Sequence, residues 1–226
     1  MTAAVPPPRP APGLLDVRRL SRAEGDEWLH GLLWQAGDGW RMISSAVLGG
    51  GIGERSWVLN AQVSHGYTRT DPDRHLAELA LDAGVRGPGV GLMTAADVRA
   101  YGHARDGGVE AVATAGLGVR GWAASPAPAT AARPGTVNIV VALPVALTDA
   151  ALVNAVATAT EAKVQALLAA GYDCSGTPTD AVCVAARSPA ADDEVHAFAG
   201  PRSLWGARVA RAVHRAVHTA ARTGRP

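Results

Sequence analysis

The chain has 226 residues and a formal net charge of +1, and 48% of its residues are apolar against 18% charged. This length and composition allow a full-sized buried core, which excludes an intrinsically disordered protein, and the near-zero charge gives no reason to expect a nucleic-acid partner. No stretch approaches 18 uninterrupted apolar residues, so we expect no membrane-spanning segment.

The N-terminal residues 1–13 are rich in proline and lack the basic start and apolar stretch of a signal peptide. They predict a disordered tail. A second stretch rich in Ala and Pro, 123–135, predicts an exposed loop. We interpret it as a loop inside a single domain, 14–220, that is followed by a short tail, 221–226. A linker between two domains is the alternative, but each half alone is too small for its strands.

Four short runs before this loop are apolar or β-branched and are bounded by glycine, which is typical of strands: 41–50, 56–63, 89–95 and 109–117. Two helices are predicted between these runs. Residues 71–84 offer Asp71 as the N-cap and Pro72 at the first helical position. Residues 94–102 offer Thr94 as the N-cap.

After the loop, the pattern predicts a strand, a helix, a strand and a helix, at 136–143, 149–170, 180–186 and 203–222. The mixture of strands and helices indicates an α/β protein with a layered sheet-and-helix core, and α+β is the alternative. The order is not a regular series of strand–helix–strand units, so we predict no Rossmann sheet.

The helix at 149–170 contains Lys163, the sole lysine of the chain. At 100° per residue, Lys163 and Thr160 fall inside the arc of apolar residues that includes Leu152 and Leu167, whereas Glu161 and Thr158 fall on the opposite, polar face. A lysine on the inward face either extends its amine to the surface or is buried against a charged partner. The second reading makes Lys163 a candidate site residue.

Four further patterns leave function open. The sequence "GGGIG" at 49–53 does not fit G-x-G-x-x-G, so it predicts a turn at the end of a strand or a place where the backbone approaches a ligand. His65 follows a strand and precedes a glycine, which suits both a cleft and a plain loop. His214 and His218 predict a surface pair rather than a metal site. Cys174 and Cys183 have the spacing of neither a disulfide framework nor a zinc site, which favours reduced thiols in the cytoplasm.

The stretch "CSGTPTDAVCVAA", 174–186, sets small polar residues against the start of an apolar strand. One interpretation is a turn, in which Asp180 and the threonines bind nearby backbone groups. The other is the wall of a functional site.

Several segments together resemble one family. The segments "GTVNIVVALPVALTDAALVNAVATATEAKVQALL", "SGTPTDAVCVAA" and "FAGPRSLWGARVARAVHRAV", with "LNAQVSHGY" and "VEAVATAGLG" upstream, resemble the adenosylcobinamide amidohydrolase family of corrinoid salvage over roughly residues 30–220. The resemblance implies hydrolysis of the amide that joins aminopropanol to adenosylcobinamide, which yields adenosylcobyric acid. It also implies no metal or other cofactor held by the protein, because the cobalt belongs to the corrinoid substrate. The segment "TAGLGVRGWA" lacks the Asn expected after the glycine, which puts the lining of that region in doubt.

A fainter resemblance is to the ornithine acetyltransferase fold, which implies layers in the order αββα. By that resemblance Thr136, freed by cleavage of the Gly135–Thr136 bond, is the nucleophile, Thr114 and Gly116 lie at the oxyanion, and Asp180 and Thr179 support the site. The alternative is a water mechanism that uses Glu161, Lys163 or Asp180. The expected substrate-binding residues are Asn60, His65, Thr114, Gly116, Asn138, Thr160, Thr177, Thr179 and Ser203.

Two rival functions stay open at this point. One is a corrinoid-binding protein without catalysis, and the other is an amidase that acts on a different small substrate. The substrate of the favoured reading is large, so Trp57, Trp122 and Trp205 are expected at the rim of a wide cleft. The sequence leaves a homo-oligomer open.

Overall fold

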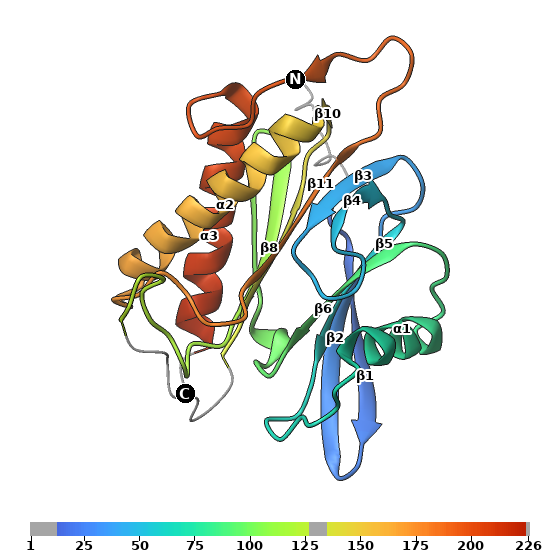
Figure 1. The fold of residues 1–226 in the computed structure, drawn as a ribbon, viewed down its shortest axis with the longest axis vertical. Coiled ribbons are helices and arrows are strands. Elements are labelled where there is room, and N and C mark those ends of the chain that lie inside the picture. Colours follow the sequence, from blue (N-terminus) through green and yellow to red (C-terminus); the bar gives the residue numbers. More distant parts are fainter. Residues whose placement is uncertain (1–12, 127–134, 225–226) are drawn as a thin grey trace, which may run out of the picture.

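The computed structural model describes residues 13–126 and 135–224 (Figure 1). The expected tail at 1–12 and most of the Ala/Pro-rich loop therefore lie outside the described residues. The elements in chain order are β1 (Val17–Glu24), β2 (Glu27–Gln35), β3 (Trp40–Ser44), β4 (Gly51–Glu54), β5 (Trp57–Gln62), α1 (Pro72–Asp82), β6 (Gly89–Thr94), the short 3₁₀ helix η1 (Val98–Ala100), β7 (Gly102–Asp106), β8 (Val109–Ala115), β9 (Val137–Ala142), β10 (Ala146–Leu147), α2 (Asp149–Ala169), β11 (Ala181–Arg187), β12 (Val195–His196) and α3 (Leu204–Thr223).

Two sheets form the centre of the described part of the chain. One has the strand order β4-β3-β11-β9-β8-β7, and the other has the order β1-β2-β5-β6. Most neighbouring strands are antiparallel, but β9 and β11 are parallel to each other, as are β5 and β6. β10 and β12 make a separate two-stranded parallel pair.

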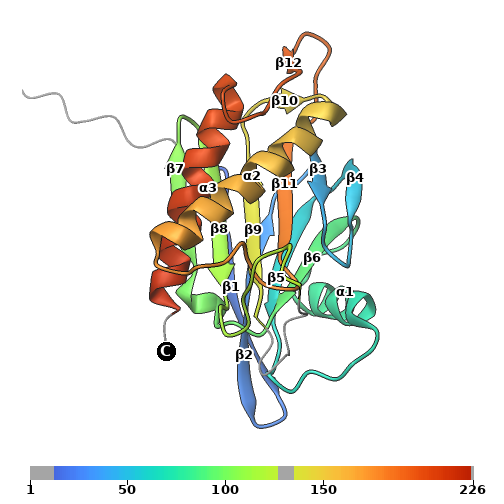
Figure 2. The same ribbon diagram turned by 60° about the vertical axis from the view of Figure 1, so that its left-hand side comes forward.

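The layers follow the order helix, sheet, sheet, helix (Figure 2). α2 and α3 cover the outer face of the β9-containing sheet, and their shared core includes Ile139, Leu152 and Val213. A second core, with Leu32 and Val140, lies between the two sheets. A third core packs α1 on the outer face of β5 and β6. The chain is one α/β domain, and its layering is the αββα order expected from the fainter resemblance.

The local signals around the helices are mostly confirmed. The Thr148 side chain caps α2 by accepting a hydrogen bond from the backbone N–H of Ala151, at 3.2 Å. Pro72 begins α1, but the carboxylate of Asp71 pairs with Arg69 and makes no capping bond. α3 includes Thr223, so the expected C-terminal tail at 221–226 starts later than predicted.

The helix predicted at 94–102 is wrong. β6 continues through Thr94, and only the short turn η1 precedes β7. Thr94 Oγ1 accepts a hydrogen bond from the N–H of Ala96, and Asp97 does the same for Arg99. Such local bonds give the backbone an alternative to a helix. The strand predicted at 41–50 also ends early, at Ser44, and "GGGIG" forms the turn into β4 and its first residues.

The inward face of α2 differs from the predicted arc. Val153 is 56% exposed, whereas Thr158 is buried and its hydroxyl donates to the carbonyl of Ala199 at 2.8 Å. Alanines fill most of the inward face: Ala151, Ala155, Ala159, Ala162 and Ala166. Their small side chains let α2 lie close to its neighbours, so bulky residues were a poor guide to this face. No helix in 13–126 or 135–224 has the length and apolar character needed to cross a membrane.

Candidate active site

The candidate site lies where β9 and β11 begin. The two strands are parallel neighbours, with Asn138 beside Ala181, so the residues that precede them are brought together. Thr136 Oγ1 lies 2.6 Å from Thr179 Oγ1 although the two are 43 residues apart. Both hydroxyls are at one end of the two-sheet sandwich, and the whole of β9 separates them from β10 at the other end (Figure 2).

Asp180 connects three parts of the chain. Its Oδ1 accepts a hydrogen bond from the N–H of Val137 at 2.9 Å, and its Oδ2 accepts one from the N–H of Thr177 at 3.2 Å. Oδ2 also makes an ion pair with Nζ of Lys163, and each of these two side chains is only 10% exposed. Lys163 is therefore buried against a charged partner, one of the two alternatives left open by the sequence. An ion pair this well buried needs such additional hydrogen bonds to offset its desolvation.

Gly176 makes room for this ion pair. Its backbone has φ +154°, a conformation that other residues rarely adopt. A Cβ at this position would collide with the Asp180 carboxylate and would lie 2.6 Å from Lys163 Nζ. The glycine of "SGTPTD" is thus required by both its backbone conformation and its surroundings.

Two side-chain hydroxyls lie within hydrogen-bond distance of the Gly135 carbonyl, but the single proton of the Thr177 hydroxyl is shared with Asp180 Oδ1, which lies 2.5 Å away. Thr177 Oγ1 lies 2.8 Å from the Gly135 oxygen and Thr179 Oγ1 lies 3.0 Å from it. When Thr179 donates its one hydroxyl proton to Gly135, the Thr136 hydroxyl donates in turn to Thr179. The peptide bond before Thr136 therefore has a hydrogen-bonded carbonyl on one side and the Thr136 hydroxyl on the other.

Gly116 and its surroundings hold this peptide in place. The N–H of Gly116 donates to the carbonyl of Thr136 at 2.9 Å. A Cβ on Gly135 would lie 2.6 Å from the carbonyl oxygen of Gly116 and 2.8 Å from that of Val119. The close backbone approach restricts position 135 to glycine.

A buried polar network lies next to Thr136, between the sheets. Asn138 Nδ2 donates to Asn60 Oδ1 at 2.8 Å and to the carbonyl of Met93 at 3.1 Å. Asn60 Nδ2 donates to Thr114 Oγ1 at 2.9 Å. Among the described residues, Asn138 Oδ1 has no hydrogen-bond partner. These three side chains are at most 5% exposed, so they can act on a substrate only by positioning the start of β9 or by admitting a group into the sandwich.

Of the other expected residues, Glu161, Thr160 and Ser203 lie apart from this cluster, whereas His65 is at the same end of the sandwich. Glu161 and Thr160 are exposed on α2, and the Thr160 hydroxyl donates to Val156 of its own helix at 2.9 Å. Ser203 caps α3 at the opposite end of the domain. His65 is exposed on the loop that follows β5.

The three tryptophans expected at a rim lie in different places. Trp57 is 5% exposed and packs below α1, and Trp205 lies against His196 and Arg208 near the start of α3. Trp122 is 46% exposed, and its neighbour Gly121 pairs with Gly176 of the site loop. Only Trp122 is thus next to the cluster.

Neither cysteine is a nucleophile in this state. Burial raises the pKa of the Cys183 thiol to about 12, and burial also raises the pKa of Cys174. Within the described ranges, no group of three or more His, Cys, Asp or Glu side chains could hold a metal ion. The chemistry offered at the cluster is that of hydroxyls, a carboxylate and an amine.

Sequence reasoning missed the roles of Gly135 and Gly176. The glycine–threonine pairs "GT" at 135–136 and 176–177 were the available signal, because each sets a small flexible residue before a hydroxyl in the segment that leads into a strand.

Comparison with known proteins gives two findings. A family model described as adenosylcobinamide amidohydrolase matches residues 16–225. A protein named adenosylcobinamide amidohydrolase, from Methanosarcina mazei, is 35% identical over 141 residues, which cover 62% of this chain and 67% of that protein.

Proposed function

This chain belongs to the adenosylcobinamide amidohydrolase family, and from that premise we propose that it hydrolyses the amide between aminopropanol and the corrinoid in adenosylcobinamide. The products are adenosylcobyric acid and aminopropanol, which a cell can reuse in corrinoid salvage. The cobalt is part of the substrate, so the protein itself supplies only side-chain chemistry.

The contact of Thr136 with Thr179 beside the Gly135 carbonyl is the observation from which we assign particular residues to this reaction. Amide hydrolysis needs a nucleophile, a stabiliser for the oxyanion and an acid for the leaving amine. Thr136 supplies a hydroxyl, and it is 6% exposed while the bond to Gly135 is intact. We assign the nucleophile to Thr136.

The first step in this scheme is cleavage of the chain itself. Thr136 Oγ1 attacks the carbonyl carbon of Gly135, the C–N bond breaks, and the hydroxyl proton passes to the nitrogen of Thr136. The Thr179 hydroxyl stabilises the oxyanion, and the Thr177 hydroxyl joins it when its proton turns from Asp180 Oδ1 to the Gly135 oxygen. Water then hydrolyses the resulting ester, which leaves a carboxylate on Gly135 and a free amino group on Thr136.

The second step uses the new amino group as the base. It takes the proton of the Thr136 hydroxyl, and Thr136 Oγ1 attacks the carbonyl carbon of the substrate amide. The amino group then gives this proton to the nitrogen of the amide, the C–N bond breaks, and aminopropanol leaves. Water hydrolyses the corrinoid ester and restores the hydroxyl. The N–H of Gly116, next to Thr136, is the proposed donor to the oxyanion of this reaction, for which it must give up its hydrogen bond to the Thr136 carbonyl.

The alternative is direct attack by water with the chain uncleaved. Asp180 and Lys163 are its best-placed groups, because they are buried together one residue from Thr179. Their mutual ion pair and the hydrogen bonds to Val137 and Thr177 occupy both carboxylate oxygens, which favours a structural role. We therefore prefer the threonine mechanism.

The test combines mass and turnover. Purified protein is examined by intact mass under denaturing conditions and is incubated with adenosylcobinamide, and adenosylcobyric acid is measured by chromatography. We expect two fragments that meet at Gly135–Thr136 together with product. Thr136→Ala removes both, Thr136→Ser retains both, and Thr219→Ala, an exposed threonine of α3, changes neither.

Each other outcome selects a rival. Uncleaved protein with full activity eliminates the self-cleaving scheme and leaves the water mechanism. Binding of adenosylcobinamide without product selects a corrinoid-binding protein, and turnover of generic amides alone selects an amidase with a different substrate.

A further inference from the structure

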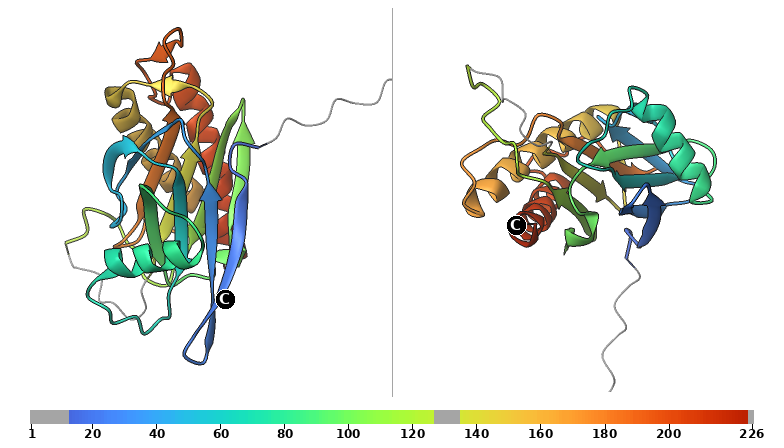
Figure 3. Two further views of the ribbon diagram at one scale, coloured as in Figure 1. Left: turned by 90° about the vertical axis from the view of Figure 1, so that its right-hand side faces the viewer. Right: turned by 90° about the horizontal axis from the view of Figure 1, so that it is seen from below.

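The β1–β2 hairpin projects beyond the rest of its sheet. β5 pairs with β2 only over Gly31–Gln35, so residues 27–30 of β2 pair with β1 alone. At about 3.3 Å per residue, this part extends roughly 13 Å past the sheet. The left panel of Figure 3 shows the hairpin leaving the body of the domain, and Figure 2 shows that it does so at the end where β9 and β11 begin.

The hairpin is braced at the level of the candidate site. The N–H of His30 donates to Gln62 Oε1 at 3.1 Å, and Arg22 donates to the Gln62 carbonyl at 2.7 Å. Gln62 is the last residue of β5, two residues after Asn60, which contacts Asn138 of β9. The projecting strands are therefore held at the end of the sandwich where Asn60 and Asn138 meet.

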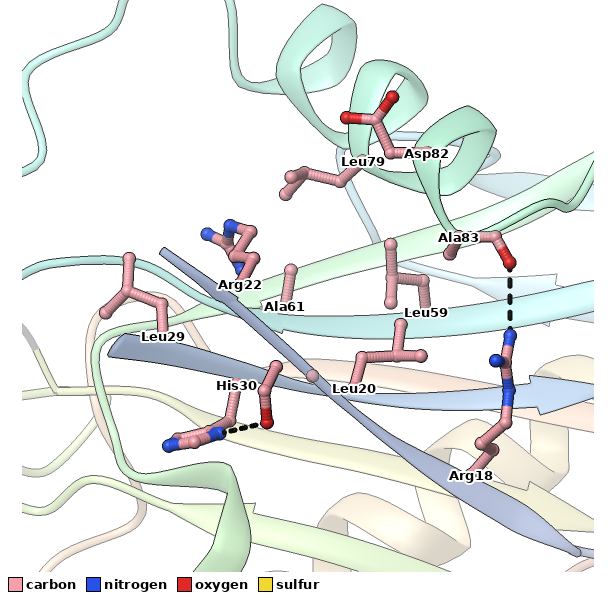
Figure 4. Close-up of a pocket in the computed structure, with 12 residues that line it drawn as sticks. Arg18, Leu20, Arg22, Leu29, His30, Leu59, Ala61, Leu79, Asp82 and Ala83 are labelled. Carbon is pink, nitrogen blue, oxygen red and sulfur yellow. Dashed lines mark hydrogen bonds between the residues drawn. The ribbon is translucent and has the colours of Figure 1, made fainter. Parts of the chain in front are cut away.

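One face of the hairpin continues the face of β2 that packs between the sheets. Leu32 and Trp34 of β2 pack between the sheets, and alternation along the strand puts His30 and Trp28 on the same face. Figure 4 shows His30 on the far side of the hairpin from Leu79 of α1. Trp28 is 69% exposed, so a large aromatic surface on this face has no cover among the described residues.

A recess of about 260 Å³ lies on this face, and its lining includes His30, two residues along β2 from Trp28. We call it the hairpin recess, and its side chains include Arg19, Ser21, His30, Leu32, Val98 and Arg99. Ser21 Oγ lies 2.9 Å from His30 Nδ1, which leaves Nε2 of the ring with no hydrogen bond from the described residues. The Arg99 guanidinium is paired with Asp97, at 2.8 Å, and Arg19 adds a second guanidinium to the lining, so the recess offers hydrogen-bond donors.

We propose that the hairpin recess and Trp28 bind the adenosyl group of the substrate. This inference rests on the proposed function, which supplies the substrate. The recess is too small for a corrin macrocycle but matches the scale of one nucleoside. The ring nitrogens of adenine and the ribose hydroxyls accept hydrogen bonds from such donors, and Trp28 offers the flat surface on which a base stacks. The macrocycle then extends from the hairpin toward Thr136.

The kinetic test compares two corrinoids. Adenosylcobinamide carries the group that the recess recognises, and dicyanocobinamide lacks it. We expect Trp28→Ala to raise KM for adenosylcobinamide by about tenfold with little change in kcat, and to leave KM for dicyanocobinamide unchanged. Trp28→Phe retains a stacking surface and recovers most of the affinity. Phe198→Ala, at an equally exposed aromatic of the opposite end, is the matched control.

A binding test separates this inference from the proposed function. 5′-Deoxyadenosine alone is expected to bind the full-length protein, as measured by saturation-transfer NMR, and Trp28→Ala and His30→Ala are expected to lose that binding. An equal rise in KM for both corrinoids assigns Trp28 to the macrocycle and overturns the inference, as does absence of nucleoside binding. If the protein hydrolyses neither corrinoid, the proposed function fails, while nucleoside binding lost in Trp28→Ala still upholds the recess.

Discussion

Asp180 Oδ1 accepts a hydrogen bond from the backbone N–H of Val137 at 2.9 Å, so a carboxylate of one loop fixes the start of the neighbouring strand. The same carboxylate is held by Lys163 from α2. The position of Thr136, which immediately precedes Val137, thus depends on a residue 44 positions along the chain and on a helix behind the sheet.

The Lys163–Asp180 pair is expected to dominate the stability of this end of the domain. Lys163→Met should lower the free energy of unfolding by about 3–5 kcal/mol, because it leaves a buried carboxylate without its partner. Lys163→Met combined with Asp180→Asn should recover a large part of that loss, since neither charge then remains. Urea unfolding measures both. A double variant as unstable as the sum of the single variants would contradict the pairing.

Gly176 should tolerate substitution much less well than another glycine with positive φ. Gly37 has φ +72° and open space around its Cβ position. The only cost expected for Gly37→Ala is therefore that of holding alanine in a left-handed backbone conformation, about 1–2 kcal/mol. Gly176→Ala adds a collision with Asp180 and Lys163. We expect a larger fall in the unfolding midpoint for Gly176→Ala and a loss of turnover. Equal effects for the two variants would remove the steric argument.

The thiols should be silent in the native protein. Because burial raises the pKa of Cys183 to about 12, its thiolate is scarce at ordinary pH, and Cys174 is buried as well. We expect both cysteines to react with a disulfide reagent such as DTNB only as fast as the protein unfolds. Reaction of either thiol in native buffer, followed by absorbance and located by mass, would show an opening that this structure lacks.

Glu110 should make the attachment of the N-terminal segment sensitive to acid. Burial alone would raise the pKa of this carboxyl, but hydrogen bonds from the N–H groups of Leu14 and Leu15, with His103 and Arg105 nearby, hold it below its ordinary value. A lowered native pKa stabilises the fold above the unfolded pKa, and that stability is lost as pH falls through the native pKa.

Glu110→Gln is therefore expected to cost roughly 1–3 kcal/mol at neutral pH and progressively less below pH 4.5, the ordinary pKa of a glutamate. Urea unfolding at several pH values checks this, with Glu194→Gln, an exposed carboxyl, as the control. Parallel stability curves for Glu110→Gln and the parent protein would show that the carboxylate is not the acid-sensitive group.

Local signals in the sequence were sufficient for much of the fold. Glycine-bounded strands such as 109–115 and capped helices such as α2 depend on neighbours in the chain, so pattern and capping rules find them. The β1–β2 hairpin was not predicted, because Leu29, Leu32, Leu33 and Trp34 are buried on both faces of β2 and hide the alternation. Strands covered on both sides lack a period-two pattern.

The candidate site was predictable only in part. Lys163 could be placed inward from its helix, and Thr179 and Asp180 stood out at a strand entry. The approach of Thr136 to Thr179 depends on parallel pairing of β9 with β11, and no local pattern encodes a register across 43 residues. Glu161 shows that closeness in sequence does not ensure closeness in space. It is near Lys163 in sequence, but two helical positions separate their directions by about 200°.

The order of strands in the larger sheet has a consequence for any break between β8 and β9. The strands β3 and β8, from the first part of the chain, flank β11 and β9, from the second part. If the chain is cut there, strands of the second fragment lie between strands of the first. Neither fragment could then leave without disrupting the sheet. A processed molecule would therefore migrate as one particle in native buffer and reveal its two polypeptides only after denaturation.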